Sequence, residues 1–589
     1  MEGSRIMRRQ PRVAPLCASL AMALGLGPVA SGTATAATVT NCNSSGAGSL
    51  RSAIAATAEG GTVTFAPGFP ACTITLLTSA IPIAVNNLTI QGPAGNTVKV
   101  NGAQNYRIFN HAGTGTLTLS HLYLENGKYS GTNANGGCIV SAGAVSVDAS
   151  TLTGCMAYAN GSSGKARGGA IHAAKGVTLT NSSVTDNVAV GFGGAFGGGI
   201  DALSLTMQFS TVSGNYATFP NGKLPGDGGV FNGGGVYVGT GATNITNSTI
   251  ADNTANGAQN DHIGTTASGG GIFGKGSIYV GASAVYGCRS AAHDKSQGGG
   301  IFANAALTVS QSRIAGNYAQ GTDGAYGGGL RAGSLVANYA TIHDNLVGAG
   351  PYGFSGAFQG GGIFVYKGST QIGHSTIDAN TTVGAGGGIF TIASNVTLND
   401  STVSGNRGFG NGSAPAGSGG LQMAGTEATL HISNSTIAFN VGSGGSNDYL
   451  GGGVRAFGTA VIESSIIANN AMGPDPSDLS CACGTNAVKK ISGANDLIMT
   501  IDPGAVLAPP GMVVATADPH LVPLGDHGGA TRSHALLATS AAAGLGNNLA
   551  NFTTDQRGIG FARVTAGFVD IGAYQRQPND DELFFDGYE

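Results

Sequence analysis

Side chains suited to recognising a sugar gather in loop segments near the middle of the chain. Two consecutive segments supply carboxylates, imidazoles and cations, and neighbouring loops add tyrosines. Charged groups of this kind form strong hydrogen bonds, and an imidazole can also act as a general base. The candidate ligand-binding residues are Asp261, His262, Arg289, His293, Asp294, Lys295, Tyr326 and Tyr352. The alternative is that long exposed loops collect polar residues and pack on their own aromatic rings.

The sequence favours binding over catalysis. A glycoside hydrolase needs two carboxylates placed across the glycosidic bond, but Asp186, Asp252 and Asp344 recur at one repeat position on non-adjacent units. A lyase needs a base and a way to neutralise a uronate carboxylate, by Lys, Arg or Ca²⁺. We therefore assign no catalytic residue, no metal site and no cofactor, and expect Ca²⁺ only if the chain is a lyase.

A short repeat must position these loops, and it occurs eleven times between Gly136 and Asn469. A Gly-rich start precedes an aliphatic residue and, 12 to 16 residues later, a Ser/Thr-rich triplet that ends in a second aliphatic residue. Three residues further comes an Asn, as at Asn253, or a Cys in the units of Cys155 and Cys288. Self-similarity at a period of about 20 to 50 residues is typical of solenoids.

Each unit contains three short runs that resemble β-strands. In the unit that begins at Gly298 they are residues 301–302, 307–309 and 312–314. The runs are apolar or β-branched and are bounded by Gly, Asn or Ser. Three strands per turn, stacked on the next turn, predict an all-β parallel β-helix. The Gly slots suit positive φ and the Asn slots suit left-handed corners, so both belong to the scaffold.

The length of the units varies at one place. From the closing aliphatic residue to the next opening one, the gap ranges from 12 to 24 residues. Insertions therefore map to one side of the solenoid, which in repeat proteins is often the binding face. We expect the candidate residues to lie along that loop edge.

The chain divides into five segments. Residues 1–36 resemble an export signal, because basic residues precede an apolar run and a small-residue cleavage site. Residues 37–135 form the N-terminal cap and first coils, with a short amphipathic helix predicted over residues 49–56. Residues 136–470 hold the eleven repeats. Residues 471–577 are an irregular, proline-containing region, and residues 578–589 an acidic-aromatic tail. We expect no transmembrane segment in the mature chain.

Export allows disulfides to form. The candidates are Cys42 with Cys72 and Cys138 with Cys155. Cys155 and Cys288 lie four coils apart, about 19 Å, which is too far for a bridge. The pairing of the remaining cysteines, and the state of Cys288, stay open.

The charge balance limits the class of partner. A net charge of −4 with 10% charged residues gives no electrostatic reason to expect nucleic acid or an anionic membrane. We expect a monomer.

Several motifs resemble known bacterial surface proteins. The start, residues 37–54, is similar to that of exported right-handed β-helix repeat proteins, and the Gly-Gly-Ile and Ile-x-x-Asn repeats resemble those of polymorphic outer-membrane proteins. Residues 518–537, 553–558 and 569–574 resemble the choice-of-anchor Q domain. Two departures are visible, because the Asp usual in that domain is absent at residues 540–546 and its final Glu is Gln575. The resemblance implies a right-handed helix and a surface location, and it implies no catalytic residue.

Together these observations predict a secreted or cell-surface solenoid. We expect a non-catalytic adhesin that binds an extracellular glycan or host material through its loop edge. The alternative is a polysaccharide lyase or glycoside hydrolase, since parallel β-helices often carry such activities.

Overall fold

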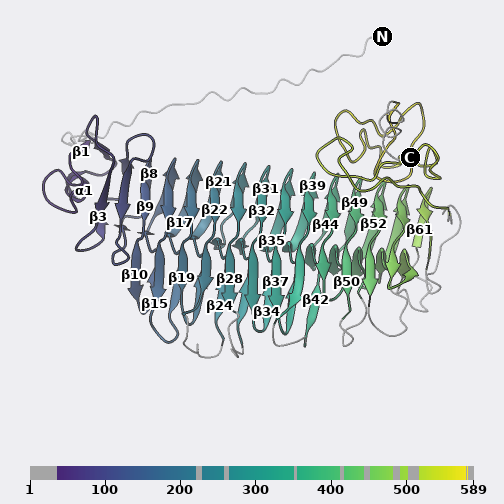
Figure 1. Ribbon diagram of the computed structural model, residues 1–589, viewed down its shortest axis with the longest axis horizontal. Coiled ribbons are helices and arrows are strands. Elements are labelled where there is room, and N and C mark those ends of the chain that lie inside the picture. The colour runs from purple at the N-terminus through teal and green to yellow at the C-terminus, as the bar shows by residue number, and fades with distance from the viewer. Residues whose placement is uncertain are drawn as a thin grey trace, which may run out of the picture.

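The computed structural model describes residues 36–220, 228–257, 264–350, 355–410, 417–443, 451–481, 491–501, 517–578 and 580. It is a parallel β-helix, as predicted (Figure 1). Its strands stack into four sheets, which we call sheet A with 26 strands, sheet B with 15, sheet C with 13 and sheet D with 8. Nearly all neighbouring strands pair in parallel with the equivalent strand of the next coil; for example, Ile314 lies beside Ile342.

Central coils contribute a strand to all four sheets, so the prediction of three strands per unit is wrong there; coils near both ends have no strand in sheet D. In the unit that begins at Gly298 the first two predicted runs are one long strand, and two further strands lie in the segment predicted to be a loop. Those two strands are rich in Ala and Gly, which have low β-propensity, so they do not stand out in the sequence. In the coil that starts at Ile301 the strands are β35 (Ile301–Ser310), β36 (Arg313–Ala315), β37 (Tyr318–Gly321) and β38 (Gly324–Tyr326).

Sheets A and B enclose the main core. Aliphatic side chains such as Ile301, Ile314 and Leu330 stack coil upon coil and are 0% exposed. Sheets C and D pack against each other through small side chains, among them Ala157, Ala166 and Ala195. They form a thin projection, which we call the fin and which is the lower tier in Figure 1. The variable gap between aliphatic residues spans the fin, so length variation does fall on one side.

Two ladders of polar side chains hold the corners. The Asn slots form one ladder, in which each Oδ1 accepts from the backbone N–H and Nδ2 of the preceding coil, as between Asn317 and Asn345. A column of serines forms a second ladder at the corner between sheets A and B, as between Ser283 and Ser312.

The ladders correct two details of the repeat. The last member of the Asn ladder is Asn470, not Asn469, because Ile467 rather than Ile466 is in register with Ile437. The left-handed φ lies one residue before the ladder, for example 54° at Asp344. The ladder Asn itself therefore serves as a hydrogen-bonding residue, and its neighbour makes the turn.

Both predicted disulfides are present. Cys42 is bonded to Cys72, and Cys138 to Cys155. Cys288 occupies an Asn slot, is a free thiol and is fully buried. Burial raises the pKa of the Cys288 thiol to about 12, so it is an uncharged space-filling group at neutral pH.

The predicted N-terminal helix is α1 (Leu50–Ala56), which begins at the Ser49 cap and buries Leu50, Ala53 and Ile54. That it caps the solenoid stays a prediction. The described residues include no helix long and apolar enough to cross a membrane. The predicted export signal lies outside the described residues.

The C-terminal region, residues 517–578, folds back onto the outer face of sheet B (Figure 1). Its contacts are both apolar and polar, since Ile466 and Leu497 pack with Leu536 and Ile571 of this region. Arg563 pairs with Asp400, Arg532 with Asp378, and the Gln556 side chain accepts from Thr402. Both members of the Arg563–Asp400 pair are fully buried, so the region is docked by contacts that water cannot compete for.

The Ser ladder ends at a buried carboxyl group, and this predicts a pH effect. Burial, and to a smaller extent the charge of Glu463, raises the pKa of Asp496 to about 8, while the Ser465 N–H opposes the shift. The unfolded chain titrates at its ordinary value, so the folded form holds an extra proton between pH 3.8 and about 8. Stability is therefore full below that window and falls as pH rises through it.

Asp496→Ser should remove this loss and continue the ladder. Relative to the variant, the wild type should lose about 2–4 kcal/mol of unfolding free energy between pH 5 and pH 9. Urea unfolding of both proteins at the two pH values measures the difference. Identical pH dependence of the two would show that Asp496 is not held protonated.

Candidate functional site

Among the sequence-predicted ligand-binding residues with described positions, the structure places Arg289 on one face of the fin and Lys295 and Tyr326 on the other. Arg289 lies on the outer face of sheet C, where it stacks over Tyr318 and donates to Gln320. Lys295 and Tyr326 lie on the outer face of sheet D. These are opposite faces of the fin, because Ser290 and Ser296 meet inside it at 2.6 Å between their hydroxyl oxygens.

His293 and Asp294 lie at the turn between these faces. The His293 Nδ1 is 3.0 Å from the Asp294 carboxylate, which also accepts from the Gly264 N–H. Asp294 therefore closes a loop contact between coils. Asp261, His262 and Tyr352 lie outside the described residues. Among the residues with described positions, no group of three or more His, Cys, Asp or Glu side chains could hold a metal ion.

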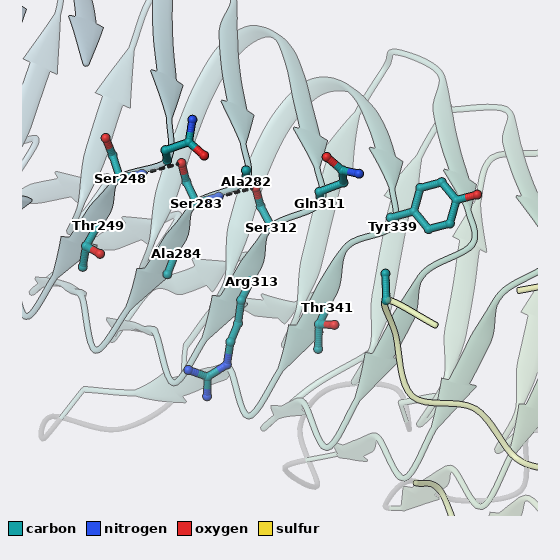
Figure 2. Close-up of a pocket in the computed structure, with 12 residues that line it drawn as sticks. Ser248, Thr249, Ala282, Ser283, Ala284, Gln311, Ser312, Arg313, Tyr339 and Thr341 are labelled. Atoms are coloured by element: carbon teal, nitrogen blue, oxygen red, sulfur yellow. Dashed lines mark hydrogen bonds between the residues drawn. The ribbon is translucent and has the colours of Figure 1, made fainter. Parts of the chain in front are cut away.

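A recess on the other side of the solenoid is a better candidate site (Figure 2). It has a volume of about 700 Å³ and opens on sheet B beside the C-terminal region. Ala282 and Ala284 form its floor. The equivalent positions of the two neighbouring coils carry larger side chains, for example Thr249 and Arg313 beside Ala284. The lining residues are Asn247, Ser248, Thr249, Ala282, Ser283, Ala284, Gln311, Ser312, Arg313, Tyr339, Thr341 and Ala530.

Two rows of side chains form the recess walls. The first row precedes the Ser ladder and has left-handed φ at Asn247, Gln311 and Tyr339. Figure 2 shows Gln311 and Tyr339 turned outward from the corner. The second row comes from outward positions of sheet B, where Arg313 and Thr341 are in register. The left-handed corner thus presents amide and phenol groups beside a row of hydroxyl and guanidinium groups.

A hydrogen-bonded chain holds Arg313 in place. The Arg313 Nε lies 2.7 Å from His343 Nε2, and His343 Nδ1 lies 2.6 Å from the Asp344 carboxylate. The Arg313 Nη groups are left for other partners in this part of the recess. A guanidinium held at Nε is a well-oriented donor for ring hydroxyls or carboxylates.

The C-terminal region fixes the far wall. Tyr339 stacks on His374 with ring centroids 4.7 Å apart, and His374 Nδ1 lies 3.1 Å from the Asp555 carbonyl oxygen. Gly558 lies so close to the Tyr339 ring that a side chain there would meet it. Burial lowers the pKa of His374, which keeps this stacked ring neutral at pH 7.

A second candidate lies at the corner between sheets A and D. Outward side chains of the two sheets meet there: the rings of Phe196 and Tyr237 are 5.3 Å apart, and those of Tyr326 and Phe364 are 5.1 Å apart. In sheet A a single column of outward positions continues through six coils. We call it the corner column; it consists of Tyr237, Phe273, Phe302, Arg331, Phe364 and Phe390.

Both sites were readable in the sequence as positions within the repeat. The corner column is the residue after each opening aliphatic residue, as in Ile301-Phe302. The first row of the recess consists of the residue before each Ser/Thr triplet, as at Gln311 and Tyr339. Residues that interrupt a repeat stand out in a sequence, whereas these residues recur within it.

Comparisons with protein-family models, curated proteins and solved structures found no match. The resemblances to polymorphic outer-membrane proteins and to the choice-of-anchor Q domain therefore stay predictions.

Proposed function

We propose that this protein is a secreted or cell-surface solenoid that binds an extracellular glycan, without cleaving it, in the recess of sheet B. The observation that carries the proposal is the composition of that recess. Its walls combine amides, hydroxyls, a guanidinium and a tyrosine around a floor of alanines. Such planar polar groups suit sugar hydroxyls, and a phenol ring offers an apolar surface for a sugar face.

The spacing of carboxylates agrees with binding rather than hydrolysis. Asp186 and Asp252 occupy equivalent corners with Gly214 between them, so they lie two strand spacings apart, about 10 Å. Retaining glycosidases place their two carboxyl groups about 5 Å apart, and inverting enzymes about 6.5–9.5 Å. The Asp186–Asp252 pair therefore fits neither class of glycosidase, and it does not bear on the lyase alternative.

Filling the recess floor tests the proposal. The mature protein is screened against immobilised polysaccharides, and the tightest one is carried forward. Ala284→Phe places a ring in the recess and should weaken binding about tenfold or more, equal to about 1.4 kcal/mol. Unsaturated uronate absorbance is followed in parallel to detect cleavage.

Thr211→Phe is the matched control, because Thr211 is an outward residue of the same sheet B column, outside the recess lining. It should leave affinity unchanged. Equal affinity of Ala284→Phe and wild type would move the site elsewhere, and accumulation of unsaturated product would replace binding with a lyase activity.

A further inference from the structure

Arg331 lacks the partners that a buried guanidinium ordinarily has. Its Nε and Nη1 atoms are buried and have no hydrogen-bond partner among the described residues. Burial lowers the pKa of Arg331, while Tyr366 opposes the shift. A desolvated cation without an acceptor is costly, so its place in the fold needs an explanation.

Other buried arginines in this chain have acceptors. Arg557 and Arg563 are paired with Asp555 and Asp400, at 2.8 and 2.5 Å between nitrogen and oxygen. Arg107 donates to the carbonyl oxygens of the 135–136 turn. The fold thus supplies carboxylates or carbonyls where a guanidinium serves structure, and Arg331 differs from this pattern.

The surroundings of Arg331 form an aromatic platform. Its guanidinium lies 4.4 Å over the Phe302 ring, and Phe364 is its neighbour in the next coil. Tyr326 packs on Phe364 from sheet D. Tyr366, on the same face of its strand as Phe364, is 40% exposed. Arg331 is therefore flanked by rings in the coils on both sides and lies beside an exposed phenol.

A second cation, Lys275, also lies beside an aromatic ring of the corner column. The Lys275 Nζ lies 5.9 Å over the ring of Tyr237, at the other end of the corner column. Lys275 belongs to the coil of β30 (Ile272–Gly274), two coils before that of Arg331. Two strand spacings separate these coils by about 10 Å. Cations at intervals beside aromatic rings suit a chain of acidic sugars better than a single small anion.

We propose that the corner column binds an acidic polysaccharide through its carboxylates, with Arg331 as the main anchor. The guanidinium, which has no acceptor for Nε and Nη1 among the described residues, would turn outward to form a two-point contact with one uronate carboxylate. The exposed Tyr366 ring would contact an apolar sugar face, and the buried Phe302 and Phe364 rings would support the guanidinium. This site is separate from the recess of sheet B and does not depend on the proposed function there.

Binding of oligogalacturonate to the full mature chain tests the proposal by calorimetry. Arg331→Met should weaken binding about tenfold or more, and Arg331→Lys should weaken it less, since the charge remains but the two-point contact is lost. Arg407→Met, on the outer face of sheet C and outside both proposed sites, is the matched control and should bind as the wild type does. Affinity for oligogalacturonate should fall with added salt.

Two further measurements keep the outcome decisive. Arg331→Met should unfold at or above the wild-type temperature, since it removes an unpaired buried charge, and oligogalacturonate should raise the wild-type midpoint only. Dextran and dextran sulfate separate uncharged and sulfated ligands from carboxylated ones. Unchanged binding by Arg331→Met, or tighter binding of dextran sulfate than of oligogalacturonate, would overturn the proposal.

Discussion

Asn345→Ala is expected to lower the free energy of unfolding of the central coils by about 3–5 kcal/mol. The Asn345 Nδ2 donates to the Ile314 carbonyl and to Asn380 Oδ1, both at 2.9 Å. Its Oδ1 accepts from the backbone N–H and the side chain of Asn317, both at 3.0 Å. Alanine would leave buried donors and acceptors on both neighbouring coils without partners, and each such group costs about 1–3 kcal/mol.

A solenoid need not unfold in a single global transition, so the loss is best measured locally. Hydrogen exchange of the backbone amides around residues 317 and 380 provides that measurement. Cys288→Asn is the matched control, with the opposite sign. Asn253 Nδ2 now lies 3.9 Å from the Cys288 sulfur, so an amide should strengthen the ladder by about 1 kcal/mol. Equal protection in wild type and Asn345→Ala would show that the ladder does not stabilise the coils.

Arg563→Met is expected to weaken docking of the C-terminal region by about 3–5 kcal/mol, because the variant leaves Asp400 buried without its cation. Burial raises the pKa of Asp400 to about 7, and Arg563 opposes this shift. Without Arg563 the carboxyl must be protonated to stay buried. Docking in the variant should therefore persist at low pH and be lost as pH rises.

Limited proteolysis at pH 5 and pH 8 reports this as release of residues 517–578. The double variant Arg563→Met with Asp400→Leu should restore docking, because removing both charges of a buried pair is close to neutral. Release of the region by the double variant as readily as by Arg563→Met would mean that loss of side-chain shape, not the stranded charge, is responsible.

The scaffold was predictable because its rules are local. The spacing of aliphatic residues predicts the coil, and the recurring glycines predict backbone positions with positive φ. Cys138 and Cys155 flank one repeat closely enough to form a disulfide. The fin was not predictable in this way. Its strands contain residues such as Ala319 and Ala325, which pack well only because two sheets face each other, and no single run shows that pairing.

The candidate site was harder for a similar reason. Arg289 and Lys295 are six residues apart, and the sequence predicts both along one loop edge. A strand, a turn and a returning strand separate them, so they face opposite ways from the fin. The recess depends on Tyr339 being held by residues near Gly558, a contact between segments more than 200 positions apart that local patterns do not encode.

A glycan bound to this protein is expected to contact the recess of sheet B. Amide hydrogen exchange of the full mature chain, with and without the tightest-binding polysaccharide from the screen, measures this. We predict added protection at residues 247–249, 282–284, 311–313 and 339–341. Protection confined to the fin, or none at saturating polysaccharide, would contradict the assignment of the sheet B recess as the glycan-binding site.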